Sequence, residues 1–190
     1  MSQNTPKGFR LHIGIFGRRN VGKSSLLNAI TRQQVSIVSD TAGTTTDPVE
    51  KPMELLPFGP VLFIDTAGID DAGGVGELRV SRTRQVFDRT DMGVIVTDGK
   101  WEEFEERILL ELRKRSVPVI VVFNKMDLCS PPPQALAELD RRKIPSVKVA
   151  AKTGDGALRF RQVLLDNAPA DFIEIPPLSQ TLSVRAKSPC

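Results

Sequence analysis

The chain has 190 residues, of which 40% are hydrophobic and 26% charged, and its formal net charge at pH 7 is +3. This length and composition are typical of one soluble domain with a buried core, and the small charge and the lack of tyrosine argue against a nucleic-acid surface. The two cysteines, Cys129 and Cys190, provide neither a disulfide framework nor a zinc or iron–sulfur site, and such usage fits a reducing cytoplasm. We expect no signal peptide and no membrane span.

Hydrophobic runs and periodic patterns predict an alternation of strands and helices along the chain. The expected strands are Leu11–Phe16, Met53–Leu56, Val61–Ile64, Gly93–Thr97, Val117–Phe123 and Ser146–Val149. The expected helices are Lys23–Thr31, Glu77–Phe87, Glu103–Lys114, Pro133–Arg142 and Leu158–Leu165. The later strands are continuously apolar, as parallel strands between two helix layers are. The alternation therefore predicts a doubly wound α/β domain.

The connections between these elements indicate the limits of the domain. The short link between the second and third strands permits an antiparallel hairpin at one edge of the sheet. The threonine-rich segment Gln33–Val49 and the glycine-rich segment Gly68–Gly76 are expected to be mobile loops. We expect a flexible N-terminus over residues 1–9, one folded domain over residues 10–166, and a linker or disordered tail over residues 167–190.

The segment Gly17–Ser24 reads GRRNVGKS and fits the pattern G-x-x-x-x-G-K-[ST] at every fixed position. It lies between the first predicted strand and the first predicted helix, so its backbone N–H groups and the helix N-terminus point to one spot. Such a loop binds phosphates: Lys23 would reach the β- and γ-phosphates, and the Ser24 hydroxyl would hold Mg²⁺. The residues expected at the nucleotide here are Gly17, Arg18, Arg19, Asn20, Val21, Gly22, Lys23, Ser24 and Ser25.

The segment Asp65-Thr66-Ala67-Gly68 follows the third predicted strand. A carboxylate at the carboxyl end of a strand beside the phosphate-loop strand can hold Mg²⁺ through water, which is the role expected for Asp65. Because glycine has no side chain, the backbone amide of Gly68 can approach a γ-phosphate. The position of this segment downstream of the phosphate loop supports both assignments.

The segment Asn124-Lys125-Met126-Asp127 follows the fifth predicted strand and is the most specific signal in the chain. The Asp127 carboxylate can accept two hydrogen bonds from the N1–H and N2 amino groups of guanine, and adenine has no matching donors. The Lys125 stem can cover the purine face, and Asn124 can connect the neighbouring loops. The segment Ala150–Lys152 follows the last strand and can offer backbone N–H groups, that of Ala151 among them, to guanine O6.

Together and in this order, the motifs resemble those of P-loop GTPases over roughly residues 10 to 166. GRRNVGKSSLLNAI and DTAGTTTD are similar to the translation-factor-related branch, which includes TrmE-like and Era-like proteins. GTTTDPVEKPMELLPFGPVLFIDTAGIDD, followed by GELRVSRT, most resembles the GTPase domain of the HydF family of [FeFe]-hydrogenase maturation factors. The resemblance implies a Ras-like, six-stranded, mostly parallel sheet with one antiparallel edge strand and helices on both faces.

The same resemblance implies specific residue roles. The Mg²⁺ ligands fall on Ser24, Thr45 and Asp65, with Asp65 acting through water, and Thr44 joins Thr45 at the nucleotide. A K⁺ site beside the phosphates falls on Asn20, Ser39, Thr41 and Thr44, although Asn20 could instead cap the loop through its side chain.

The residues expected to take part in hydrolysis include Lys23 and Thr45. Three further positions, Gly68, Ile69 and Glu77, also bear on this reaction. Gly68 precedes Ile69, where many relatives carry a water-orienting glutamine; isoleucine cannot hydrogen-bond water, so hydrolysis is slow or follows another route. Glu77 could position the attacking water, or it could be an acidic residue favoured at the start of a helix.

By this resemblance, the chain binds GTP with Mg²⁺, hydrolyses it slowly to GDP and phosphate, and is the nucleotide switch of a hydrogenase-maturation scaffold stimulated by K⁺. Its partners would be guanine nucleotides and, through domains outside this chain, hydrogenase-maturation proteins and the hydrogenase. A GTP-dependent homodimer is also expected. Two alternatives stay open: a GTP-gated binding module with negligible hydrolysis, and a GTPase domain acting in tRNA modification or ribosome assembly. No membrane or nucleic-acid partner is expected.

Overall fold

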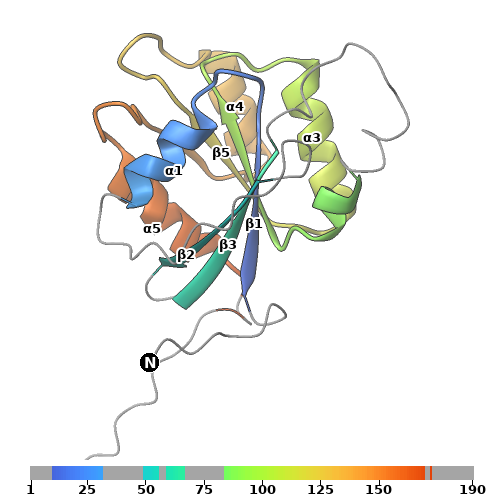
Figure 1. Cartoon of the computed structure of the whole chain (residues 1–190). Coiled ribbons are helices and arrows are strands. Elements are labelled where there is room, and N and C mark those ends of the chain that lie inside the picture. The colour runs from blue at the N-terminus through green and yellow to red at the C-terminus, as the bar shows by residue number, and fades with distance from the viewer. Residues whose placement is uncertain (1–9, 32–48, 56–58, 67–83, 170–171, 173–190) are drawn as a thin grey trace, which may run out of the picture.

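A six-stranded sheet forms the centre of the protein (Figure 1). The computed structural model describes residues 10–31, 49–55, 59–66, 84–169 and 172. The strands are β1 (Leu11–Phe16), β2 (Val49–Leu55), β3 (Gly59–Asp65), β4 (Met92–Thr97), β5 (Val119–Phe123) and β6 (Ser146–Lys148). The helices are α1 (Lys23–Thr31), α3 (Glu103–Lys114), α4 (Pro133–Arg141) and α5 (Ala157–Asn167), and residues 84–88 are also helical.

The strand order is β2-β3-β1-β4-β5-β6, and every neighbouring pair but one is parallel. The exception is the antiparallel β2–β3 hairpin, in which Met53 lies opposite Val61. All residues of β4 and β5 are buried, as their continuously apolar sequences predict for strands covered on both faces. The pairing confirms the predicted mostly parallel sheet with one antiparallel edge strand.

Helices cover both faces of the sheet (Figure 1). On one face, Leu26 of α1 and Phe160 of α5 pack with Ile13 and Ile15 of β1 in one hydrophobic cluster. On the other face, Leu109 of α3 and Leu139 of α4 pack in a second cluster with Phe123 of β5. This two-layer covering is the doubly wound arrangement that the sequence predicts.

Several element boundaries differ from the prediction. The strand expected over Val117–Phe123 begins at Val119, because Ser116 adopts a left-handed φ of 58° and the Val117 N–H still bonds the carbonyl of Leu112 in α3. Both hairpin strands and α5 are longer than predicted, whereas β6 and α4 each end one residue earlier. Of the helix expected over Glu77–Phe87, residues 84–87 are described, and these are helical.

Some predictions fall outside the described residues. These are the flexible N-terminus over residues 1–9, most of the loop Gln33–Val49, the loop Gly68–Gly76, and most of the tail. At the start of the tail, Ala168 and Phe172 pack against the core cluster that contains α5.

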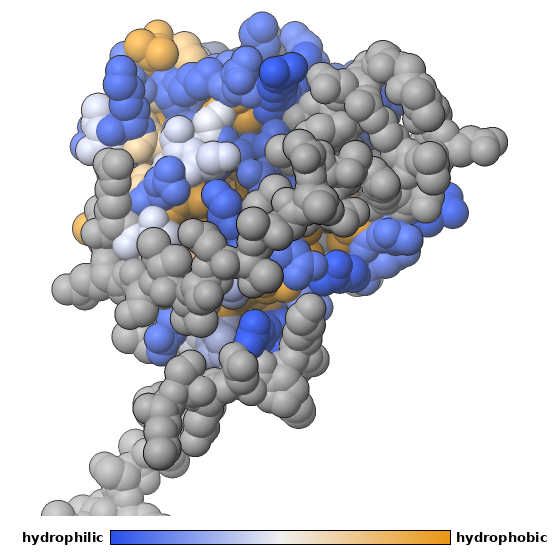
Figure 2. All heavy atoms as spheres, viewed as in Figure 1, coloured by the Kyte–Doolittle hydropathy of each residue, from blue (hydrophilic) through white to orange (hydrophobic). Residues whose placement is uncertain are grey.

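On the face shown in Figure 2, the described residues expose mostly hydrophilic side chains, and hydrophobic atoms show in small separate areas. Three large hydrophobic side chains are exposed among the described residues. Leu110 lies on α3, Leu128 lies in the loop after β5, and Leu158 lies on α5. Within the described ranges, no helix combines the length and the apolar character that crossing a membrane requires.

Candidate nucleotide site

The phosphate loop connects the buried end of β1 to the start of α1 and depends on glycine at two positions. Gly17 has φ 146°, and a Cβ there would lie 2.2 Å from the carbonyl oxygen of Val96. Gly22 has φ 93°, and a Cβ there would lie 2.3 Å from Nδ2 of Asn124. Any larger residue would collide with these neighbours, so the glycines of the motif are required by close packing as well as by backbone conformation.

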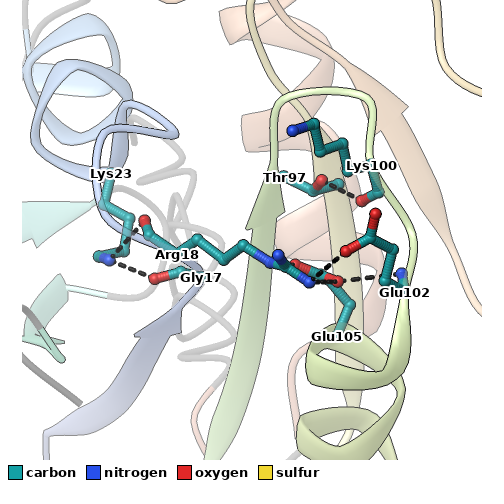
Figure 3. Close-up of polar contacts among 7 residues, drawn as sticks. All are labelled: Gly17, Arg18, Lys23, Thr97, Lys100, Glu102 and Glu105. Atoms are coloured by element: carbon teal, nitrogen blue, oxygen red, sulfur yellow. Dashed lines mark hydrogen bonds and ion pairs between the residues drawn. The ribbon is translucent and has the colours of Figure 1, made fainter. Parts of the chain in front are cut away.

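Lys23 is buried at the first turn of α1, and its ammonium folds back over the loop. Nζ donates a hydrogen bond to the carbonyl of Gly17 and another to the carbonyl of Arg18 at 3.1 Å (Figure 3). Two carbonyls therefore fix the position of a positive charge beside the N-terminus of α1. A phosphate bound there would meet both the ammonium and the helix dipole.

The two described residues predicted to share Mg²⁺ lie together. Parallel pairing places Asp65 opposite Ile15 at the carboxyl ends of β3 and β1, and the next residue, Thr66, bonds the Ile15 carbonyl through its hydroxyl at 2.6 Å. The Ser24 hydroxyl lies 3.4 Å from Oδ2 of Asp65. A hydroxyl and a carboxylate side by side fit a hard, oxygen-seeking cation such as Mg²⁺.

Asn124 connects three segments of the site from inside the protein. The residue is 2% exposed; Nδ2 donates to the Val21 carbonyl at 2.8 Å, and Oδ1 accepts from the Ala151 N–H at 3.0 Å. The predicted connecting role of Asn124 thus has a definite geometry. In the structure, the Ala151 N–H that was predicted to contact guanine O6 donates to Asn124.

A cavity of about 350 Å³ opens beside these residues. Asp127 is exposed at its wall, where its carboxylate can face a base. Lys125 has a left-handed φ of 60°, and its ammonium lies 3.4 Å from Oδ2 of Asp98, which holds the stem along the cavity. The lining residues are Gly22, Ser25, Asn28, Ala29, Asn124, Lys125, Asp127, Leu128, Ala151 and Lys152.

Other predicted residues contribute differently. Arg19 and Asn20 are exposed at the loop, Asn20 with φ 63°, and the Asn20 side chain has no hydrogen bond to another described residue. The alternative that Asn20 caps the loop therefore finds no partner in this part of the chain. Ala150, although predicted at the nucleotide, is buried and pairs with Asp155 through its backbone.

The remaining predicted site residues lie outside the described residues. They are Ser39, Thr41, Thr44, Thr45, Gly68 and Glu77.

Sequence reasoning missed two side chains that touch the site. Asp98 contacts Lys125. The sequence feature that could have indicated it is its position directly after β4, the strand that neighbours β5 in the sheet. Glu105 bonds Arg18 of the phosphate loop, and its local signal was the spacing from Glu102 that forms a capping box at the start of α3.

The fold and this set of side chains define a P-loop GTPase. Residues 12–125 match the family described as "50S ribosome-binding GTPase", and the chain belongs to this family. It is of the TrmE, Era and Der type, an enzyme class that uses GTP, GDP and Mg²⁺ and hydrolyses GTP.

Relatives and solved structures agree with this assignment. GTPase Der from Wolinella succinogenes is 42% identical over 63% of this chain and 26% of its own length. The tRNA modification GTPase MnmE from Chromobacterium violaceum is 38% identical over 82% of this chain and 34% of its own length. The chain thus spans about a third or less of these relatives.

Among solved structures, Era from Aquifex aeolicus bound to GDP and AlF₄⁻ matches with a TM-score of 0.65 and 28% identity, over 83% of this chain and 56% of that one. The G domain of the Thermotoga maritima iron transporter FeoB matches with a TM-score of 0.61 and 21% identity, over 83% and 98%. The second match shows the shared fold alone.

Proposed function

We propose that this domain is a nucleotide switch that binds GTP with Mg²⁺ and hydrolyses it slowly to GDP and phosphate. One observation carries the proposal: the buried amide of Asn124 joins the phosphate loop to the Ala151 loop, and so aligns the phosphate cradle with the Asp127 cavity. A nucleotide bridging the two would place its base against Asp127 and its phosphates at Lys23. Adenine would leave the Asp127 carboxylate without its two donors, which strongly favours guanine.

The phosphate side of the site stabilises charge. The ammonium of Lys23 and the N-terminus of α1 attract the negative charge that grows on the phosphate oxygens during transfer. Ser24 and Asp65 would hold Mg²⁺, which supplies further neutralisation of the phosphates when bound. Ile69 offers no hydrogen bond to an attacking water, so turnover is expected to be slow. Glu77 is the candidate for positioning that water, and a helical role is its alternative.

We further propose that K⁺ stimulates hydrolysis. The proposed ligands are Asn20, which the structure leaves exposed at the phosphate loop, with Ser39, Thr41 and Thr44. A cation there would neutralise charge between the β- and γ-phosphates as an arginine finger does. The alternative is a GTP-gated binding module whose hydrolysis is negligible without a partner. A second copy of the chain, in a homodimer that forms only with GTP, would be such a partner.

The relatives favour a role in tRNA modification or at the ribosome, because the matching chains include a tRNA modification GTPase at 38% identity. A hydrogenase-maturation scaffold is the second candidate, and its support is the resemblance of the segment GTTTDPVEKPMELLPFGPVLFIDTAGIDD. An RNA pull-down with this chain at increasing salt separates them. Salt-sensitive retention of RNA supports the first role, and co-purification of hydrogenase-maturation proteins without RNA supports the second.

Phosphate release from GTP tests the domain's own activity. We expect slow release with GTP, none with ATP, and a faster rate in KCl than in NaCl at equal ionic strength. Equal, slow rates in both salts would contradict the K⁺ site and support the binding-module alternative. Equal hydrolysis of ATP and GTP would contradict the assignment of Asp127.

A further inference from the structure

The side chain of Arg18 leaves the phosphate loop and contacts the first turn of α3 (Figure 3). Its guanidinium donates from Nε to Oε1 of Glu105 at 2.9 Å and from Nη2 to Oε2 of Glu102 at 2.8 Å. Its Cζ also lies 5.4 Å from the centre of the Phe104 ring. The loop that receives the phosphates is thus anchored on a helix that begins beyond the next strand of the sheet, β4.

Glu105 is the buried member of this contact. Its side chain is fully buried, whereas that of Glu102 is 58% exposed. Oε2 of Glu105 also accepts the Glu102 N–H at 3.0 Å, which completes the capping box of α3. A buried carboxylate requires a compensating cation, and Arg18 provides it. Mainly through its hydrogen bond to Glu105, the pKa of the Arg18 guanidinium is raised above its usual value.

The backbone of Arg18 reaches in the other direction. Its carbonyl, next to that of Gly17, accepts a hydrogen bond from Lys23 Nζ at 3.1 Å. The link between β4 and α3 is itself fixed, because the Thr97 hydroxyl bonds the Lys100 carbonyl and the Thr97 carbonyl accepts the Asn124 N–H at 2.7 Å. A continuous set of contacts therefore runs from Glu105 through Arg18 to the ammonium of Lys23.

We propose that Glu105, acting through Arg18, is a positioning residue for Lys23 in the nucleotide site. The inference rests on the proposed function, since it concerns the binding of GTP and GDP. Without the ion pair, the Arg18 carbonyl is no longer held in place, and the Lys23 ammonium loses one of the two carbonyls that orient it while it keeps its bond to Gly17. The affinity for nucleotides that carry a β-phosphate then falls, while guanine recognition at Asp127 is unchanged.

The test measures binding of a fluorescent methylanthraniloyl derivative of GDP to the full chain with Mg²⁺. We expect Arg18→Ala and Glu105→Gln each to weaken binding roughly three- to tenfold, and the double variant to bind no more weakly than Arg18→Ala. Competition with GMP, which lacks the β-phosphate, is expected to change much less. Glu103→Gln removes the same charge from an exposed position on the same turn and serves as the matched control, with wild-type affinity expected.

A merely structural role predicts a different result. If Arg18 and Glu105 only stabilised the fold, their substitution would lower the melting temperature and leave the GDP affinity of the folded protein unchanged. Wild-type GDP affinity in a folded Arg18→Ala variant would overturn the inference, as would independent losses that multiply in the double variant, or an equal loss for GMP. If Glu105→Gln does not fold, Arg18→Ala decides alone, because the Arg18 side chain is 36% exposed and lies outside the core. Failure of the unsubstituted chain to bind GDP would overturn the proposed function and this inference with it.

Discussion

The two halves of the nucleotide site are held in different ways. The base half is held from inside: the buried amide of Asn124 bonds Val21 and Ala151, and no solvent reaches these bonds. The phosphate half is held from outside, by the partly exposed Arg18 side chain on α3. Removing one partner of a buried hydrogen bond leaves a buried polar group unsatisfied, whereas a partly exposed ion pair with several members weakens stepwise. Substitutions in the base half should therefore lower nucleotide affinity and stability more than substitutions around Arg18.

The largest expected effect is at Asp127. Asp127→Asn keeps the size of the side chain but replaces an acceptor with a donor facing the guanine N2 amino group. We expect GDP affinity to fall about a hundredfold or more, with a gain for xanthosine diphosphate, whose base carries a carbonyl at that position. Asp140→Asn, exposed on α4, is the matched control. Unchanged GDP affinity in Asp127→Asn would remove Asp127 from the base site.

The next effect tests the buried connection directly. Asn124→Ala leaves the Val21 carbonyl and the Ala151 N–H without their partner, so the free energy of unfolding should fall by about 2 kcal/mol. Urea unfolding measures this loss, and GDP binding should fall with it. Asn167→Ala removes a bond of similar length, 2.8 Å to the Val163 carbonyl, from the end of α5. Equal losses for the two variants would contradict a special role of Asn124.

A pair of glycines separates steric contact from backbone strain where the two halves meet. Gly22→Ala places a Cβ 2.3 Å from the Asn124 amide at φ 93°, whereas Gly154→Ala at φ 92° meets nothing within 4 Å. We expect about 1 kcal/mol of lost stability at Gly154 from backbone conformation alone, and clearly more at Gly22. Thermal unfolding of both variants gives the difference. Equal losses would show that the loop moves freely away from Asn124.

The smallest effect lies away from both halves, on α4. Hydrogen bonds from Arg141 and Arg142 lower the pKa of Glu138 from its usual 4.5 to about 2. Because the folded pKa is the lower one, this stabilisation is present above about pH 4.5 and is lost as the pH falls toward 2. Unfolding of Glu138→Gln should therefore be less pH-dependent than that of the wild-type protein in this window. The difference is small because the Glu138 side chain is partly exposed to solvent, which screens its ion pairs, and a large difference would contradict this placement.

The sequence predicted the parts of this protein that depend on local pattern. Continuous apolar runs gave the buried strands, and the spacing of Asn124 and Asp127 after β5 predicts the base site. The contacts Arg18–Glu105 and Lys125–Asp98 join residues that are 87 and 27 positions apart in the sequence. No local sequence pattern predicts that these residues meet. Nor does the sequence reveal that the Asn124 side chain accepts a hydrogen bond from the Ala151 N–H. Such pairings depend on which strand ends lie side by side, and this is known only once the sheet order is known.

Titration of the unsubstituted chain with GDP and with ADP, both with Mg²⁺, tests the account most directly. The geometry of Asn124, Asp127 and Lys23 predicts saturable GDP binding and an ADP affinity at least about a hundredfold weaker. Equal affinity for the two nucleotides would contradict the assignment of the cavity beside Asp127 to guanine.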